Sequence, residues 1–241
     1  LRSLGNVLFD FRPMGDDLHL FLNLGGEYST RSGTIDVPAY AASNYINGGE
    51  ANKYESHRYN RLLEAYMNNK VSLGALSMDI TAGYSFQGWR NYSPSFANLS
   101  ANGDTISPAN PFPQDTENAL MSFYGRVNGN IDNKYLLTAT LRADGSSRFS
   151  KESRWGLFPS AALGWNVLQE DFMANQQFFS SLKLRTGWGI TGQQDIYNDY
   201  GYVPNYSYGT LTAQYQFGNQ WVNILRPDAY DYNLQWEKTA T

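Results

Sequence analysis

The segment Gly187–Gly192 reads GWGITG and matches the G-x-G-x-x-G spacing of a dinucleotide-binding turn. Such a turn holds a pyrophosphate only where a strand enters and a helix leaves, because the helix N-terminus supplies the N–H groups. Residues 182–186 suit the strand, but residues 193–201 (QQDIYNDYG) have no 3.6-residue apolar repeat. The acidic residue expected about 20 positions later is also missing from residues 210–216 (TLTAQYQ). We therefore place Gly187 and Gly189 on the polar face of a strand.

Other catalytic arrangements have equally little support. The adjacent carboxylates Glu170 and Asp171 diverge in an extended chain, whereas the paired acid and base of a glycosidase converge across their substrate. Cysteine is absent, which excludes disulfides, thiolate catalysis and cysteine metal sites. The two histidines, His19 and His57, lie far apart in the sequence. We therefore predict that the protein is not an enzyme and uses no metal or other cofactor.

Length and charge narrow the class of protein further. The chain has 241 residues, enough for one large β domain or two ordinary ones. Its net charge is -4 and it has no Lys/Arg cluster, so we expect no nucleic-acid partner. The mean hydropathy is -0.50, and no apolar run approaches the ~18 residues of a membrane helix. A transmembrane β-barrel would still fit, because its lipid face is spread over alternate residues.

Period-two alternation is the dominant pattern in the sequence. In residues 76–86 the even positions are apolar, and in residues 155–167 seven alternate positions are apolar in a row. The alternation predicts an all-β protein, with strands at about 4–12, 17–29, 59–68, 75–89, 119–131, 135–146, 154–168 and 182–192 and a ninth beginning near Asn233. The chain begins without Met and stops within a strand-like pattern, so we expect a piece of a longer protein.

The predicted connections alternate in length. Residues 13–16, 69–74 and 132–134 are short, whereas residues 30–58, 90–118 and 193–232 are long and rich in Tyr, Asn, Gly and Pro. Residues 147–153 and 169–181 break this rule. The asymmetry favours an antiparallel up-and-down meander with tight turns at one end, as in outer-membrane barrels.

A soluble β-sandwich also alternates, so alternation alone does not decide between the two. Aromatic residues at the ends of apolar stretches favour the membrane barrel, because their rings are apolar while the O–H or N–H stays in water. These residues are Tyr84, Phe86, Tyr135, Trp155 and Trp165. The alternative from another class is a secreted or surface carbohydrate-binding β-domain without transport activity.

Two segments resemble a known family. Residues 134–149 (KYLLTATLRADGSSRF) and 154–165 (RWGLFPSAALGW) resemble the barrel hairpin of SusC/RagA-like TonB-dependent transporters. Residues 182–192 and 233–239 match further motifs in the same order, and residues 1–118 match more weakly. The resemblance implies that residues 1–241 are part of a 22-stranded outer-membrane barrel whose plug domain is absent from this sequence.

The resemblance also implies partners and a function. Such proteins import a bulky nutrient, usually an oligosaccharide and less often a peptide, across the outer membrane of a Gram-negative cell. They work with a SusD-like surface lipoprotein as a lid and are energised through the TonB complex, which engages the plug and N-terminus. The lipid bilayer surrounds the barrel. We therefore expect this chain to be a segment of such a transporter.

Two groups of residues are candidates for binding. Charged residues on polar strand faces should point into the lumen, toward the plug or the substrate: Asp79, Arg126, Lys183 and Arg185. Aromatic residues of the loop at 193–232 should contact the ligand or the lid: Tyr197, Tyr200, Tyr202, Tyr206, Tyr208, Tyr215 and Trp221. Sugars stack on such rings while amides and carboxylates bind their hydroxyls, but the same rings can also pack together to stiffen the barrel rim.

Two structural expectations concern the hairpin at 135–168. Pairing of Asp144 with Arg148 and Arg154 should brace the turn between its strands. Pro159 lacks the N–H that a sheet ladder needs, so we expect a β-bulge at this position.

Overall fold

A computed structural model describes residues 1–196, 198–209 and 213–241. The described residues form β-strands, three short 3-10 turns and loops. No helix among them is long and apolar enough to span a bilayer. The chain divides into two compact units, Leu1–Ser72 with Asp79–Met121 and Leu73–Met78 with Ser122–Thr241.

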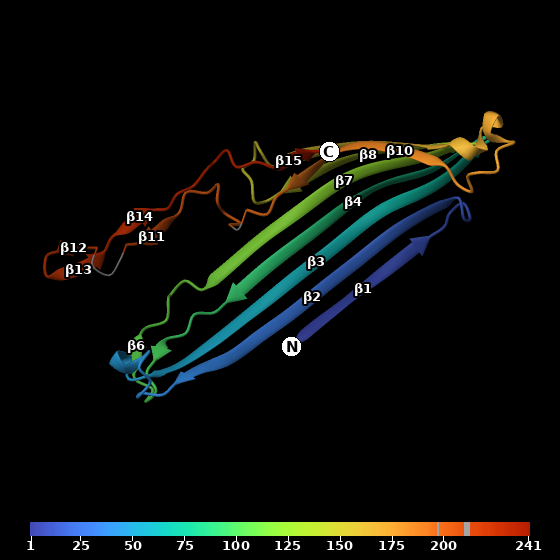
Figure 1. Ribbon diagram of the computed structural model, residues 1–241. Coiled ribbons are helices and arrows are strands. Elements are labelled where there is room, and N and C mark those ends of the chain that lie inside the picture. The colour runs from blue at the N-terminus through green and yellow to red at the C-terminus, as the bar shows by residue number, and fades with distance from the viewer. Residues whose placement is uncertain (197, 210–212) are drawn as a thin grey trace. The chain divides into compact units, whose positions relative to one another are not determined.

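The first unit is built on long antiparallel strands that lie side by side (Figure 1). They are β1 (Arg2–Phe11), β2 (Leu18–Val37), β3 (Glu50–Leu73) and most of β4 (Leu76–Ser93), followed in the sheet by β7 (Gln114–Ile131), which the two units share. The turns after β1 and β3 lie at one end of these strands, and η1 (Tyr45–Asn47) and β6 (Thr105–Ser107) lie at the other (Figure 1).

Strands β2 and β3 extend much further than the sequence pattern predicts. The expected loop at 30–58 is mostly strand, because pairing continues from Thr30↔His57 to Val37↔Glu50. The expected loop at 90–118 is likewise reduced to residues 94–113, which hold the short pair β5 (Asn98–Leu99) and β6. Residues 29–34 of β2 (STRSGT) are polar or glycine on both faces, so backbone hydrogen bonds hold this part of the extension without any apolar alternation that could reveal it.

In the second unit the sheet order is β7, β8 (Tyr135–Ser146), β9 (Trp155–Asn166), β10 (Lys183–Gln193) and β15 (Glu237–Ala240). The turn from β7 to β8 has Asp132 and Asn133 at φ 52° and 58°, the left-handed conformation of a tight hairpin turn, in which Asn and Asp are favoured. Among the described residues, β1 and β15 stand at the two ends of the sheet order, and no pairing joins β10 to β1.

Two features of this unit depart from expectation. The expected loop at 193–232 contains two small antiparallel pairs: β11 (Tyr206–Tyr208) with β14 (Leu225–Pro227), and β12 (Gln214–Phe217) with β13 (Gln220–Asn223). The prediction of a β-bulge at Pro159 is wrong, because β8 and β9 pair without a register shift through Leu141↔Pro159. Pairing of β9 with β10 ends at Ser160↔Gly189, so Pro159 lies where that side of the strand needs no donor.

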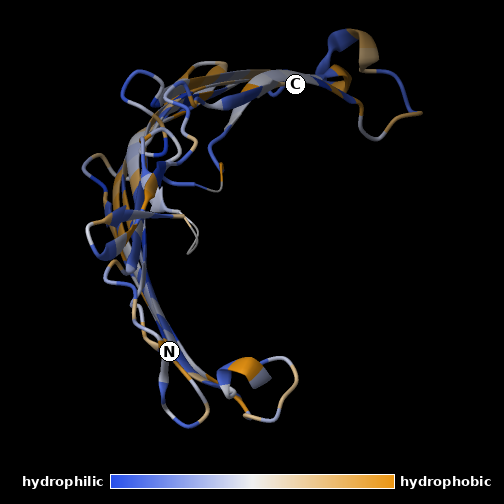
Figure 2. Cartoon of the chain, turned by 90° about the vertical axis from the view of Figure 1, so that its left-hand side faces the viewer, coloured by the Kyte–Doolittle hydropathy of each residue, from blue (hydrophilic) through white to orange (hydrophobic). Residues whose placement is uncertain are grey.

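The buried core is small, and β2, β8, β9 and β10 each have an exposed apolar face. Phe149, Phe158, Val167 and Trp236 are the buried hydrophobic residues among those described. The leucines that alternate along β2, β8, β9 and β10 remain about half exposed, as Leu163 does at 57%. Figure 2 shows hydrophobic and hydrophilic residues mixed along the strands, as period-two alternation requires.

Candidate functional site

Strand register places a polar network on one face of the first unit. Leu8 lies opposite Asn23, which lies opposite Glu64, so these side chains share a face. Asn23 donates a hydrogen bond to the Glu64 carboxylate at 2.8 Å and accepts one from Asn6 at 3.4 Å. The opposite face of β2 carries Leu20, Leu22 and Leu24, so the network lies on the face turned away from the exposed leucines of β2, although the exposed Leu8 of β1 shares it.

Asp79 belongs to the same polar face. Its carboxylate accepts a hydrogen bond from Asn68 Nδ2 at 2.7 Å, and the same amide lies 3.1 Å from Thr81 Oγ1. Asn68 lies opposite His19, on the face of β3 that also carries Glu64, and its hydrogen bonds place Asp79 and Thr81 of β4 on this face. The structure therefore places Asp79 where the alternation predicts it, held by a neighbouring strand.

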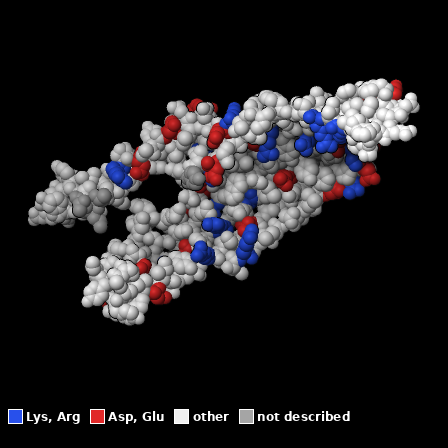
Figure 3. Space-filling model, viewed as in Figure 1, with Lys and Arg blue, Asp and Glu red and all other residues white. Residues whose placement is uncertain are grey.

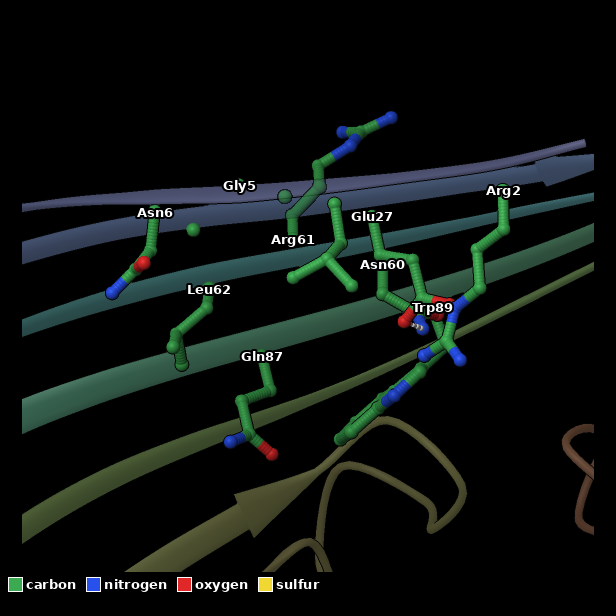
Figure 4. Close-up of a pocket in the computed structure, with 12 residues that line it drawn as sticks. Arg2, Gly5, Asn6, Glu27, Asn60, Arg61, Leu62, Gln87 and Trp89 are labelled. Carbon is green, nitrogen blue, oxygen red and sulfur yellow. Dashed lines mark hydrogen bonds and ion pairs between the residues drawn. The ribbon is translucent and has the colours of Figure 1, made fainter.

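A hollow of about 350 Å³ lies further along this face (Figure 4). Its floor is an ion pair between Arg2 Nε and Glu27 Oε1 at 2.5 Å, and Asn60 donates to the other Glu27 oxygen at 3.1 Å. The Trp89 ring lies beside these three groups, while Arg61 points to the opposite face (Figure 4). The remaining lining residues are Leu4, Gly5, Asn6, Gly25, Gly26, Leu62 and Gln87.

The hollow combines a flat aromatic ring with amides, a carboxylate and a guanidinium. A ring of this kind can stack on the apolar face of a sugar, and the polar groups can exchange hydrogen bonds with hydroxyls. Trp89 was not singled out by sequence reasoning, although it continues the odd-numbered series of β4 that includes Asp79. In the described part of the chain, no three His, Cys, Asp or Glu side chains gather as metal ligands would.

The polar face of the second unit carries three further cations predicted to face the lumen. Arg126 Nε lies 3.4 Å from Thr140 Oγ1 across β7 and β8. Lys183 and Arg185 lie on β10 opposite Asn166 and Gly164, on the face that also holds Phe158. The structure places all three on the polar face of the second unit, and Asp79 belongs to the first unit.

The ion pairs expected to brace the turn between β8 and β9 are different from those observed. Asp144 binds Arg142, two residues earlier on its own strand, at 2.7 Å. Arg142 also donates to the buried Ser122 hydroxyl at 2.8 Å and lies 5.8 Å above the Tyr124 ring. The Arg154 Nε atom is buried without a hydrogen-bond partner. Side chains two apart on a strand share a face, which explains the choice of Arg142.

Arg148 instead fastens the segment that follows β10. Its Nε atom donates to Asp199 Oδ1 at 2.8 Å, and its Nη1 atom lies 3.0 Å from Asp195 Oδ1. Arg148 and Asp199 are largely buried, with side chains 18% and 14% exposed. Because these residues are charged and shielded from water, the contact is stronger than an exposed ion pair.

An aromatic cluster includes Phe149, the residue that follows Arg148 in the sequence. The Trp236 ring packs 5.5 Å from Phe149 and edge-on to Phe158 at 5.1 Å between ring centroids. Its Nε1 atom donates to the Arg154 carbonyl at 2.9 Å. Gly192 leaves the space that these rings fill, since a Cβ there would lie 2.2 Å from the Phe158 ring. The last glycine of GWGITG is therefore a packing residue in a strand, and no helix follows among the described residues.

The tyrosines and tryptophan predicted to bind ligand or lid are mostly exposed. Tyr206 and Tyr208 share one face of β11, and Trp221 lies on β13 opposite Gln216, with Tyr206 67% and Trp221 63% exposed. Tyr215 contacts Phe217, and Tyr200 and Tyr202 lie on the turn before β11. Tyr197 lies outside the described residues.

At the far end of β8 and β9, one carboxylate fixes two aromatic residues. Glu170 Oε1 accepts hydrogen bonds from Tyr135 Oη at 2.7 Å and Trp165 Nε1 at 2.9 Å. The bond from Tyr135, followed by that from Trp165, holds the pKa of Glu170 below its ordinary value. Lys134 Nζ lies 3.5 Å from the other oxygen. Each ring keeps its apolar part on the apolar strand face and its donor at the turn.

Comparisons with known proteins agree with this architecture. Residues 3–241 match the model of a family described as TonB dependent receptor-like, beta-barrel. The TonB-dependent receptor SusC of Bacteroides thetaiotaomicron is 39% identical over 99% of this chain and 24% of its own length. The TonB-dependent receptor P3 of Formosa agariphila is 32% identical over 79% of this chain and 20% of its own length.

Solved structures also match. The structure described as the RagAB peptide transporter has a TM-score of 0.83 at 18% identity, over 99% of this chain and 27% of that one. Its open-open state has a TM-score of 0.82 at 19% identity, over 99% of this chain and 26% of that one. The chain thus spans about a quarter of the length of these relatives.

Proposed function

The chain belongs to the TonB-dependent receptor-like β-barrel family, and from this premise we propose that it is part of the wall of an outer-membrane transporter that imports an oligosaccharide. The exposed leucines face the hydrocarbon of the bilayer, and the polar strand faces line the lumen. The residues that face the lumen include Asp79, Arg126, Lys183 and Arg185, which meet the plug or the passing nutrient.

The hollow beside Trp89 is the observation that favours an oligosaccharide as the nutrient. A tryptophan ring next to an amide, a carboxylate and a guanidinium offers both surfaces that a sugar needs, a stacking face and hydroxyl partners. The 39% identity with SusC over nearly the whole chain supports a transporter of the same type. A peptide is the second candidate, because the RagAB structures, described as a peptide transporter and importer, share the fold.

A SusD-like surface lipoprotein is the proposed partner at the outer mouth. Its proposed contacts are the long loops at residues 38–49, 94–113 and 194–236; the turns after β1, β3 and β7 are tight, whereas residues 167–182 form a longer connection between β9 and β10. The exposed rings of Tyr206, Tyr208 and Trp221 in the last loop contact the lid or the nutrient. Energy coupling through TonB requires parts of the protein beyond this quarter of its relatives' length.

A pair of tryptophan variants of the intact transporter tests the nutrient assignment. Trp89→Ala removes the ring beside the hollow, and Trp188→Ala removes a half-exposed ring from the apolar face of β10 as a matched control. Fluorescently labelled oligosaccharide pools and a labelled tryptic peptide pool are the probes. We expect Trp89→Ala alone to weaken oligosaccharide binding, by about 10-fold or more for the loss of one stacked ring (~1.4 kcal/mol). Equal oligosaccharide affinities of the two variants would refute the assignment of the hollow beside Trp89 as an oligosaccharide site.

The alternative, a secreted carbohydrate-binding β-domain, makes a different prediction about solubility. Its apolar strand faces would be covered in a sandwich, whereas Leu137, Leu163 and Leu184 here are about half exposed. The intact transporter should require detergent for extraction. A parent protein that extracts into aqueous buffer and stays monodisperse would exclude the barrel.

A further inference from the structure

A second hollow, of about 550 Å³, lies on the apolar face of the second unit. Its side-chain walls come from four neighbouring strands, namely Ile131, Tyr135, Leu137, Leu163, Trp165, Leu184 and Thr186, while Leu136, Gly164 and Arg185 complete the lining. Its volume is that of a small-molecule site. The polar network of the lumen face does not reach it, so the proposed import route leaves this hollow without a role.

The hollow exists because large and small residues alternate in rows across the strands. Tyr135 and Trp165 pair in one row, and Leu137 and Leu163 pair in the next. The side chains of the next row project less far from the sheet, because Ala139 lies directly opposite Ala161. The aromatic rings thus close one end of a depression lined by leucines. At the other end the short alanine side chains leave it open.

Two carboxylates, those of Glu170 and Asp171, lie at the end of the hollow that Tyr135 and Trp165 close; we call this end the boundary. Glu170 holds the Tyr135 and Trp165 rings in place through their polar atoms. Lys134 Nζ lies 3.5 Å from Glu170 and 3.7 Å from Asp171, so two carboxylates face one ammonium group. Asp171 is fully exposed. A bound molecule reaching this boundary therefore meets net negative charge.

The turn beside the hollow extends the apolar surface past the strand ends. Phe172 is 70% exposed and its ring lies 6.5 Å from Trp165. Residues 172–182 contain no charged side chain, and Figure 3 shows a largely white surface at the corresponding end of the strands. Exposed phenylalanines continuous with a tyrosine and tryptophan pair are typical of the bilayer interface.

We propose that this hollow is a binding site for an amine-bearing phospholipid, with one acyl chain between Leu137, Leu163 and Leu184 and the ammonium group at Asp171. This inference rests on the proposed membrane location of the chain. The apolar walls select a hydrocarbon tail, and each methylene removed from water stabilises the complex. The exposed Asp171 carboxylate favours an ethanolamine headgroup over choline, because the ethanolamine ammonium can donate N–H hydrogen bonds to it and the trimethylated choline nitrogen cannot.

Photolabelling of the intact transporter in phosphatidylcholine vesicles tests the site. Trace phosphatidylethanolamine and phosphatidylcholine, each with a diazirine on the acyl chain, are the two probes, and mass spectrometry locates the label. We expect the ethanolamine probe to label Leu163 and Leu184 several-fold more than Leu22 and Leu24, which are exposed on the apolar face of β2. Equal labelling of the two pairs overturns the proposal.

Two variants examine the tail and the headgroup separately. Leu163→Trp fills the hollow and should abolish the excess labelling at Leu184, whereas Leu24→Trp, the matched control, should leave it intact. Asp171→Asn should lower the ratio of ethanolamine to choline labelling by up to about fivefold, as an exposed ion pair allows. An unchanged excess in the first variant, or an unchanged ratio in the second, overturns the proposal.

The same experiment distinguishes this inference from the proposed function. Labelling of Leu22 and Leu24 without an excess at the hollow means that the barrel lies in lipid but has no specific site. Absence of label at all four leucines means that these strands do not face a bilayer, and the proposed function fails with the inference.

Discussion

Arg148 Nε lies 2.8 Å from Asp199 Oδ1 and joins the loop between β8 and β9 to the segment after β10. The two residues are 51 positions apart in the sequence, and both side chains are largely buried. This contact anchors the beginning of the aromatic segment at 194–236. The geometry of the outer loop therefore depends on a residue of a different hairpin.

Removing this anchor should loosen the loop without unfolding the barrel. Arg148→Ala leaves Asp199 without its guanidinium partner, and hydrogen bonds to charged groups typically contribute about 1.5–3 kcal/mol. We expect amide hydrogen exchange in residues 194–205 to rise accordingly. Lys151→Ala, an exposed change in the same loop, is the control. Unchanged exchange in Arg148→Ala would show that the loop is held by other contacts.

The aromatic cluster makes a second prediction. Trp236→Ala removes the ring between Phe149 and Phe158 and leaves the Arg154 carbonyl without its donor. Truncation of a buried tryptophan typically lowers the free energy of unfolding by about 3–5 kcal/mol. We expect a lower thermal midpoint of the intact transporter in detergent. Trp236→Phe keeps most of the packing and loses only the N–H, so its midpoint should fall less; an equal loss would assign the effect to the hydrogen bond.

Glu170 gives the aromatic boundary a pH dependence. Its pKa is lowered by the hydrogen bonds from Tyr135 and Trp165, so its contribution to stability is complete above the unfolded-state pKa of about 4.3. That contribution is lost as the pH falls through the lower folded-state pKa. Glu170→Gln should therefore weaken the fall in stability with acidification. Thermal midpoints measured from neutral pH to about pH 3 provide the comparison.

Asp171→Asn is the control for this effect, because the Asp171 carboxyl is fully exposed and binds neither ring. Its pH profile should follow that of the unmodified transporter. Parallel profiles for all three proteins would mean that the Glu170 contacts do not contribute to the acid sensitivity.

The exposed rings of the last loop can be tested together. Tyr200→Ala, Tyr206→Ala and Trp221→Ala, combined in the intact transporter, should weaken binding of the oligosaccharide or of the lid lipoprotein. Isothermal titration with each partner measures the two effects. A change below about 0.5 kcal/mol in both, the range of inconsequential surface substitutions, would leave rim packing as the role of these rings.

The fold class could be predicted from alternation alone. The apolar positions of residues 76–86 and 155–167 indicate half-buried strands, and the structure and the family match confirm an antiparallel meander from a transmembrane barrel. The lengths of β2 and β3 could not be predicted, because residues 30–34 (TRSGT), where the extension begins, have no apolar residue on either face. There the hydrogen bonds between the backbones of β2 and β3 determine the structure, and they leave no apolar periodicity in the sequence.

The site could be predicted only in part, because its contacts are non-local. Period-two alternation is enough to place Asp79 and Arg126 on polar faces. The pairing of Arg148 with Asp199 and of Trp236 with the Arg154 carbonyl joins segments 51 and 82 positions apart. Local reasoning favoured Asp144 as the partner of Arg148, whereas the strand geometry brings Arg142 to Asp144 first.

The most direct test of the proposed function is energised uptake by cells that produce the intact transporter with its lid lipoprotein. Labelled oligosaccharide and labelled peptide pools are supplied separately, with and without a proton ionophore that removes the energy source of TonB. We predict that oligosaccharide accumulates in the periplasm, that the ionophore stops its accumulation, and that peptide does not accumulate. Accumulation of peptide instead of oligosaccharide, or uptake that the ionophore leaves unchanged, would contradict the account.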